Sequence, residues 1–302
     1  MKLNVDALVD KGLVKKKTYT SGIYTGLSVL KYTKKVFWKN LWHLDERLLE
    51  CRGTVVDEGD NVVVLPFKKV FNLGELPYTL DPEIEVIIPE KVNGFMAAAT
   101  MTKKYGLIIS TTGTLDSEYA VLAKKWIDRG NVELFDFGYT YLFEICDNSD
   151  LHIVKEDEGA YLIGLRDVIH GSLTDENILD NKAKKLNYKR PSVSRIKFKN
   201  IPTTNKEGFM VINATTGVVL CKLKSPFYLT KKALLRMGKK RCGLMFNNTQ
   251  EFRKQIDEEF YNLLDFILDT YSEHDYNNFT ETQRRKLFEE YFNGNNTNAA
   301  LR

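Results

Sequence analysis

The feature of this sequence that most constrains its fold is a change of hydrophobic pattern near residue 228. Before that point, apolar residues come in short runs separated by turn sequences such as Lys104-Tyr-Gly106 and Thr215-Thr-Gly217. Short runs joined by tight turns are typical of antiparallel strands. The runs that predict strands are 62–65, 84–88, 95–100, 107–110, 139–145, 151–154, 160–165, 208–212 and 218–224.

Two helical patterns interrupt these runs. One covers residues 116–128, with Ser117 as a candidate N-cap and Gly130 just past its end, and the other covers 175–186. Residues 1–228 are therefore predicted to form an α+β domain made mainly of antiparallel sheet.

The remainder of the chain has a different period. Residues 251–270 carry apolar side chains at helical spacing, and residues 282–292 predict another helix. We place a boundary near residue 229 and expect a small all-helical C-terminal domain over 229–302.

Composition excludes several protein classes. The 302 residues are 43% hydrophobic and 28% charged, as in an ordinary globular protein. No apolar run reaches the ~20 residues that span a bilayer, and residues 1–17 have no apolar core of a signal peptide. We expect a monomer without a membrane partner that works in the cytoplasm, or in the host-cell cytoplasm if it is viral.

The cysteines and histidines do not predict a zinc site. Cys51, Cys146, Cys221 and Cys242 form no CxxC pair, and the four histidines are scattered. Reduced thiols are the interpretation that this spacing favours.

Positive charge is clustered rather than general. The net charge is only +4, from 44 basic and 40 acidic residues, but basic clusters occur at 15–17, 182–190, 195–199 and 231–241. Each cluster alone is typical of a solvated face. Four such clusters favour a polyanionic partner if the chain also carries a site that handles phosphate groups.

Lys91-Val-Asn-Gly94 lies between two apolar runs. A neutral lysine amine held between two strands can attack the α-phosphorus of a nucleotide. Gly94 would then let a phosphate approach the backbone. The alternative is a plain turn, in which Gly94 supplies a positive φ.

Lys222 and Lys224 lie two residues apart at the end of a predicted strand, so they share one face with Leu220. They either bind phosphate or protect an exposed edge strand by their charge. The hairpin that begins at Glu207 is predicted to bring this acid near the lysines, either as an ion-pair partner or as a Mg²⁺ ligand.

Three further segments carry charge in unusual places. Glu144 is predicted to face away from Phe143 and Ile145, and is either a buried structural acid or a site residue. Arg52 is predicted to precede a turn. Lys69 and Phe71 share an extended face, where a cation beside an aromatic ring suits a nucleotide, although an exposed strand with one buried Phe explains them equally well.

Together these segments resemble the ATP-dependent RNA ligases of the phage tRNA-repair type. That family belongs to the covalent nucleotidyltransferase superfamily, which includes DNA ligases and mRNA capping enzymes. The elements around Arg52 and Lys69 favour RNA ligase over the other two. The resemblance covers about residues 20–230 and rests on Glu50-Cys-Arg-Gly53, Lys69-Val-Phe-Asn-Leu73, Lys91-x-x-Gly94, Phe143-Glu144, Gly164-Leu-Arg166, Glu207-Gly208-Phe209 and Lys222-x-Lys224-Ser225…Tyr228.

The resemblance implies that residues 1–228 form an adenylyltransferase domain that uses ATP and Mg²⁺ (or Mn²⁺). Lys91 would attack ATP to give lysyl-AMP, an RNA 5′-phosphate would take the AMP, and a 3′-hydroxyl would displace it. The implied partner is RNA with 5′-phosphate and 3′-hydroxyl ends, with cleaved tRNA as a candidate.

Individual roles also follow from the resemblance. Arg52, Lys69, Lys222 and Lys224 would contact phosphates, Glu144 the ribose, and Glu207 the metal. The ATP-binding set is completed by Tyr32, Phe71, Gly94 and Tyr228.

One position departs from the family, which often has a lysine just before the glycine of the segment resembling Ser110–Thr114. This chain has Thr112 there. Lys103 or Lys104 could supply the missing contact.

Three other functions stay open at this point. They are a DNA ligase, a capping-type guanylyltransferase, and an RNA-binding relative that has lost turnover.

Overall fold

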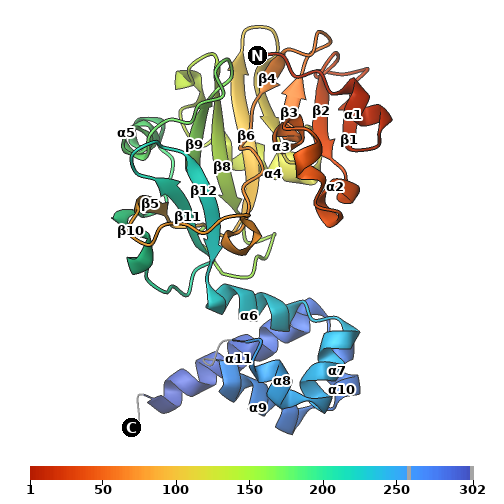
Figure 1. Ribbon diagram of the computed structural model, residues 1–302, viewed down its shortest axis with the longest axis vertical. Helices are drawn as coiled ribbons and strands as arrows, with labels where there is room; N and C mark the ends of the chain where they lie inside the picture. The colour runs from red at the N-terminus through yellow and green to blue at the C-terminus, as the bar shows by residue number, and fades with distance from the viewer. Residues whose placement is uncertain (257–259, 300–302) are drawn as a thin grey trace. The chain divides into compact units, whose positions relative to one another are not determined.

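In the computed structural model, which describes residues 1–256 and 260–299, the chain is divided into two compact units (Figure 1). The first unit comprises Met1–Ile201 and Met210–Lys222, and the second comprises Pro202–Phe209 and Leu223–Arg302. The predicted α+β class with antiparallel sheets and C-terminal helices is confirmed. The assignment of 1–228 and 229–302 as functional domains stays a prediction.

Three four-stranded sheets build the sheet-rich part of the chain. The first has the order β1 (Val14–Thr18), β2 (Ser28–Tyr32), β3 (Arg52–Val56), β4 (Val62–Val64). The second has the order β10 (Val193–Lys197), β5 (Glu85–Pro89), β11 (Gly208–Asn213), β12 (Val219–Lys224). The third has the order β7 (Gly106–Ser110), β6 (Phe95–Thr102), β8 (Tyr139–Cys146), β9 (Gly159–Asp167).

Short helices precede and connect these strands. They are α1 (Asp6–Asp10), α2 (Lys34–Trp38), α3 (Arg47–Glu50), α4 (Glu118–Ile127) and α5 (Glu176–Leu186), with 3₁₀ turns η1 (Leu41–Leu44), η2 (Leu73–Glu75), η3 (Val132–Leu134) and η4 (Phe198–Asn200). Ser117 caps α4 as predicted, because its side chain accepts a hydrogen bond from the N–H of Ala120.

Alternating apolar side chains stack the elements of the first unit in layers. Phe143 and Ile145 of β8 face a core shared with α4 and α5, whereas Leu142 faces a second core shared with β2 and β3. Within the first sheet, Val55 faces that second core and Val56 faces a third core beneath α1. The third sheet is therefore buried on both faces, and the first sheet covers one of them.

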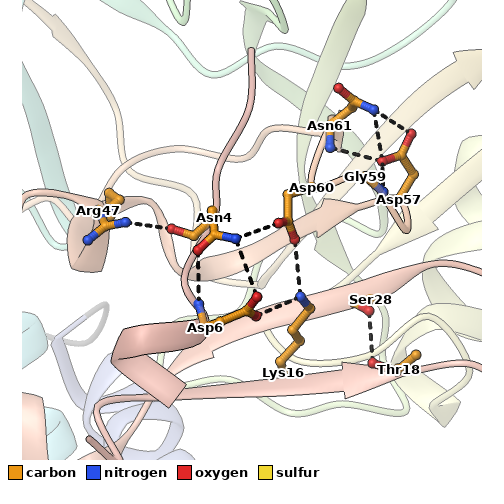
Figure 2. Close-up of polar contacts among 10 residues, drawn as sticks. All are labelled: Asn4, Asp6, Lys16, Thr18, Ser28, Arg47, Asp57, Gly59, Asp60 and Asn61. Atoms are coloured by element: carbon orange, nitrogen blue, oxygen red, sulfur yellow. Dashed lines mark hydrogen bonds and ion pairs between the residues drawn. The ribbon is translucent and has the colours of Figure 1, made fainter. Parts of the chain in front are cut away.

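Polar contacts tie the N-terminal segment to the turn between β3 and β4 (Figure 2). Asn4 Nδ2 donates to Asp60 Oδ2 at 2.7 Å, and Lys16 Nζ bridges Asp6 and Asp60 at 3.0 and 3.1 Å. Arg47 Nη1 donates to the carbonyl of Asn4 at 2.6 Å. The basic cluster at 15–17 is thus partly neutralised within the fold.

A buried ion pair joins the third sheet to the end of α3, which precedes β3 of the first sheet. Both terminal nitrogens of Arg166, on β9, donate to the carboxylate of Glu50 at 2.8 Å, and Arg166 also donates to the carbonyl of Pro66. The Arg166 side chain is 2% exposed and that of Glu50 is 8% exposed. Such bidentate geometry is the strongest form of this interaction.

The second unit contains six helices among its described residues. They are α6 (Pro226–Leu235), α7 (Lys239–Asn247), α8 (Thr249–Arg253), α9 (Tyr261–Thr270), α10 (Glu273–Asn278) and α11 (Glu281–Ala299). Arg284 is buried and donates to the backbone carbonyls of Leu235, Met237 and Tyr276. These bonds supply partners for carbonyl groups near the ends of α6 and α10.

The structure corrects two predicted elements. Residues 151–154 form no strand, because the N–H of Val154 bonds to the side chain of Asn93 rather than to a neighbouring strand. The helix predicted over 251–270 is interrupted: α8 ends at Arg253, a turn follows, and α9 begins at Tyr261. Residues 257–259 of that prediction lie outside the described residues. Strands β1, β2, β3 and β10 were not predicted.

The four cysteines are free and buried, in agreement with the sequence prediction of reduced thiols. Burial raises the pKa of Cys51 to about 12 and that of Cys221 to about 11. No group of three metal-binding side chains occurs among the described residues. Within the same residues, no helix is both long and apolar enough to cross a bilayer.

The Glu50–Arg166 pair generates a stability prediction. Glu50→Gln leaves a buried guanidinium without its counter-charge, so we expect a loss of about 3–5 kcal/mol in the free energy of unfolding, measured by urea denaturation. Asp128→Asn is the matched control, because the Lys124–Asp128 pair is exposed and its removal costs below about 1 kcal/mol. Equal effects of the two substitutions would refute the structural role of the buried pair.

Candidate active site

Lys91 lies in the short segment that joins β5 to β6. The residues after it are anchored: Asn93 Oδ1 accepts from the N–H of Val154 at 2.8 Å, and the N–H of Gly94 donates to Glu144 Oε1 at 3.1 Å. Lys91 itself is half-buried and Asn93 is buried. These bonds fix the backbone of the segment and hence the origin of the Lys91 side chain.

Gly94 is required for a steric reason. A Cβ at this position would lie 2.2 Å from the carbonyl oxygen of Ile145 and 3.0 Å from Cys146 Sγ. The backbone at Gly94 is not in the positive-φ region, so the alternative of a turn in which Gly94 supplies a positive φ does not hold. The glycine allows the start of β6 to pack against β8, and the approach of a phosphate to it stays a prediction.

Glu144 faces as predicted, away from Phe143 and Ile145. Those two side chains lie in the core with α4 and α5, whereas Leu142 lies in the core on the other face of the sheet. Glu144 is buried, and the N–H of Gly94 is one of its partners. The Glu144 carboxylate therefore contacts the backbone of the Lys91 segment at Gly94.

Arg52 begins β3, so the turn lies before it rather than after it. Its Nη1 lies 3.5 Å from Sδ of Met96, and Met96 pairs in register with Glu144 across β6 and β8. Arg52 has no acidic partner among the described residues. The guanidinium is consequently available to an anion close to the Lys91 segment.

Lys69 lies among aromatic rings, and its side chain is only 8% exposed. Its Nζ is 4.6 Å from the ring centroid of Phe71 and 5.6 Å from that of Trp42. It also donates to the carbonyl of Val70 at 3.2 Å and lies 3.7 Å from Glu75 Oε2. The predicted neighbourhood of Lys69 and Phe71 is confirmed, and the ring faces stabilise the ammonium group.

Tyr32 joins the same aromatic cluster. Its ring meets Trp42 edge-on at 4.8 Å between centroids, and Trp42 meets Phe71 at 5.8 Å. The N–H of Tyr32 donates to the carbonyl of Cys51, next to Arg52. The structure thus brings together Tyr32, Phe71 and Lys69, which the sequence resemblance had assigned to nucleotide binding.

Lys222 reaches this cluster through the backbone, because its N–H donates to the carbonyl of Phe71 at 2.8 Å. Its strand, β12, follows β11 through a tight turn and so runs in the same direction as β5, which precedes Lys91. Lys222 and Lys91 therefore lie at the same end of the second sheet.

Glu75 is an acid that the sequence prediction missed. Burial alone would raise the pKa of this carboxyl, but hydrogen bonds from Asn72 and the charges of Lys69 and Lys222 outweigh burial and lower the pKa. Asn72-Leu-Gly-Glu75 forms a capping box, a spacing that is visible in the sequence. Asn93 was also missed, and no pattern in the sequence identifies it.

A second cluster of charges lies within the second unit. Lys224 Nζ is 3.4 Å from Glu207 Oε1 and 4.9 Å from the ring centroid of Tyr228. The predicted approach of Glu207 to the strand lysines is confirmed for Lys224. Gly208 has φ +133°, and a Cβ there would lie 2.0 Å from the carbonyl of Leu223, which fixes this tight crossing.

The segment around Thr112 differs from the prediction. Lys103 and Lys104 lie at the hairpin between β6 and β7, which is the end of β6 farthest from Lys91. They therefore do not replace a lysine at Thr112. Lys31 lies much closer, because a Cβ at Gly113 would be 3.3 Å from its Nζ.

Gly94→Ala is expected to disturb the Lys91 segment. The added methyl group clashes with β8, so we expect a loss on the order of 1–3 kcal/mol in the free energy of unfolding, measured by urea denaturation. Gly74→Ala is the control, since nothing lies within 4 Å of a Cβ there. A wild-type stability in Gly94→Ala would mean that β6 and β8 can separate without cost.

Comparisons with known proteins identify the family. Several solved structures resemble the chain. Two archaeal ATP-dependent RNA ligase structures are each 13% identical to it, with TM-scores of 0.51 and 0.53, and the matches cover 95% and 94% of this chain and 74% of each of those chains. A candidate ATP-dependent DNA ligase from Aquifex aeolicus is 15% identical, with a TM-score of 0.53, and its match covers 95% of this chain and 74% of that chain. At these identities they show a shared fold. No curated protein matches. A family model described as RNA ligase, of the T4 RNA ligase 1 type, matches residues 50–231, more than half of the chain. The chain therefore belongs to this RNA ligase family.

Proposed function

We propose that this member of the family uses ATP to join RNA ends that carry a 5′-phosphate and a 3′-hydroxyl, with Lys91 as the nucleophile. The observation that carries the proposal is the anchored Lys91 segment: it is fixed by Asn93 and by the Gly94–Glu144 hydrogen bond. It also lies at the same end of the second sheet as Lys222. An amine on an anchored segment, with a lysine at the same end of the sheet, suits attack on a nucleotide phosphate.

The reaction has three steps that balance. The Lys91 amine attacks the α-phosphorus of ATP, a P–N bond forms, and pyrophosphate leaves. An oxygen of the RNA 5′-phosphate then attacks the same phosphorus, which breaks the P–N bond and regenerates the amine. Finally the 3′-hydroxyl loses its proton, attacks the activated 5′-phosphate, and AMP leaves.

The surrounding residues have distinct roles in this proposal. Arg52, Lys69 and Lys222 hold phosphate charge, and Lys224 does the same. Glu144 binds the ribose, behind the segment that it anchors through Gly94. The aromatic rings of Tyr32 and Phe71 bind the nucleotide, and the nucleotide-binding role of Tyr228 stays one that the sequence resemblance implies.

Glu207 is the proposed ligand for Mg²⁺ or Mn²⁺. Its buried carboxylate is a hard oxygen donor, which fits such an ion, and Mg²⁺ in proteins commonly uses one or two carboxylates plus substrate phosphates. The ion supplies charge neutralisation at the phosphates. Lys224 Nζ, at 3.4 Å, holds the Glu207 side chain in position.

Labelling with nucleotide tests the nucleophile. After incubation with Mg²⁺ and α-labelled ATP, followed by denaturation, we expect acid-labile label on the wild-type protein. None is expected on Lys91→Ala or without divalent ion. Lys103→Ala is the control, because Lys103 lies at the far end of β6. Label from GTP instead of ATP would indicate a capping enzyme, and no label would indicate an inactive RNA-binding relative.

The choice of substrate is tested separately. We propose cleaved tRNA as the natural substrate, and the family membership supports RNA over DNA. A cleaved anticodon stem-loop with 5′-phosphate and 3′-hydroxyl ends is expected to be sealed at least about tenfold faster than a nicked DNA duplex, with gel electrophoresis as the measurement. Preferential sealing of the nicked DNA would contradict the RNA assignment and favour a DNA ligase.

A further inference from the structure

Helix α2 exposes two adjacent aromatic rings. The side chains of Trp38 and Phe37 are 75% and 44% exposed, and their centroids lie 5.2 Å apart. Val36, between the lysines and these rings, is buried and anchors the helix to the third core. A single exposed ring is ordinary in a folded protein. The charges around this pair of rings determine which kind of ligand it can bind.

The surroundings of α2 are positive and unpaired. Residues 31–44 contain four lysines and no acid, and the next acid, Asp45, is bound to Arg47 at 2.6 Å. The four ammonium groups make no hydrogen bond or ion pair with any other residue that the structure describes. They belong to Lys31, Lys34, Lys35 and Lys39, all of which are exposed.

The basic clusters that stand out in the sequence behave differently. Lys182 pairs with Asp136, and Arg190 pairs with Glu176 and Asp180. Arg195, Lys197 and Lys199 pair with Glu85 or Glu83, and Lys16 and Lys17 also have acidic partners. Many of the charges in those clusters are thus neutralised within the fold, whereas the four lysines around α2 are not.

This surface is continuous with the proposed nucleotide site. Lys69 Nζ lies 6.0 Å from the ring centroid of Phe37 and 4.6 Å from that of Phe71. The rings of Phe37, Trp42 and Phe71 therefore lie around one buried lysine, and Trp38 extends this series from Phe37. Its exposed end is Trp38.

We propose that α2 binds a single-stranded stretch of the RNA substrate, with Trp38 stacking on an unpaired base and Lys34, Lys35 and Lys39 holding the adjacent phosphates. Exposed aromatic rings among unpaired cations are the combination that binds single strands, because bases stack and phosphates need counter-charge. The proposal rests on the proposed function only in taking RNA as the substrate.

Two other occupants fit less well. A helix of five residues is too short to lie in a membrane interface with a broad apolar face. A second copy of the chain would place its own four lysines against these four, and like charges repel.

Binding of an unreactive RNA tests the stacking. The probe is an oligouridylate of about twelve nucleotides with a 5′-hydroxyl and a 3′-phosphate, which cannot be joined. We expect Trp38→Ala to weaken binding by the full-length protein roughly 5- to 150-fold, and Trp38→Phe to remain close to wild type because it keeps a ring. Phe137→Ala is the matched control: Phe137 is 56% exposed beside Lys103, at the far end of β6, and its removal should not matter.

Salt dependence tests the lysines. Replacing both Lys34 and Lys35 by Gln should lower the slope of log affinity against log salt by about 0.7 for each phosphate that these two side chains neutralise in the wild-type complex. The paired control replaces Lys103 and Lys104 by Gln and should leave the slope unchanged. Inorganic polyphosphate, which has charge but no bases, should bind Trp38→Ala and wild type equally.

Each contrary outcome is distinct. Wild-type RNA affinity in Trp38→Ala would overturn the proposal, as would Trp38-dependent binding to anionic phosphatidylserine vesicles or Trp38-dependent dimers in sedimentation without an effect on RNA. ATP labelling of the same wild-type preparation reports on the proposed function independently. Its failure with intact Trp38-dependent RNA binding would leave an RNA-binding relative.

Discussion

The buried pair between Arg166 and Glu50 is the contact on which the candidate site depends. Glu50 ends α3, and the backbone on either side of it positions three predicted nucleotide residues. The carbonyl of Leu49 accepts from the N–H of Lys69, and that of Cys51 accepts from the N–H of Tyr32, next to Arg52. Arg166 on β9 thereby fixes this corner of the first sheet against the third sheet.

A buried ion pair is an unfavourable way to fix the position of α3 in free-energy terms, because both ions lose their hydration. Its advantage here is directional. Arg166 satisfies the carboxylate of Glu50 and the carbonyl of Pro66 together, so one side chain sets both the end of α3 and the chain that leads to Lys69. An apolar contact of similar area has no directional preference and would not define the relative positions of these two segments.

Much of the third sheet could be predicted because its strands are apolar and bounded by turns. The first sheet could not, since β1 reads Val-Lys-Lys-Lys-Thr and resembles a basic surface cluster rather than a strand. Lys16 becomes part of a polar network only when β1 meets the turn carrying Asp60, a contact of long sequence separation. The predicted strand at 151–154 was wrong for a similar reason: Val154 is bound by Asn93, distant in sequence.

Parts of the site were predictable to the extent that they are local. Lys69 and Phe71 lie two residues apart, and their contact follows from an extended backbone. Glu207 and Lys224 meet because a hairpin joins them, which the turn at Gly217 indicates. By contrast, the role of Gly94 depends on how closely β8 passes, and Trp42 enters the cluster from a 3₁₀ turn with no periodic signal.

The lysines of the first unit show two ways of keeping a cation in place, and the difference bears on function. Acids neutralise Lys16, Lys182 and Lys197, so these charges serve the fold. Lys69 has an acid, Glu75, at 3.7 Å, and the ring faces of Trp42 and Phe71 also stabilise its charge. Its ammonium group is therefore held by aromatic packing as well as by an acid. Because the same rings continue outward to α2, a site for phosphate and a surface for bases arise from one packing arrangement.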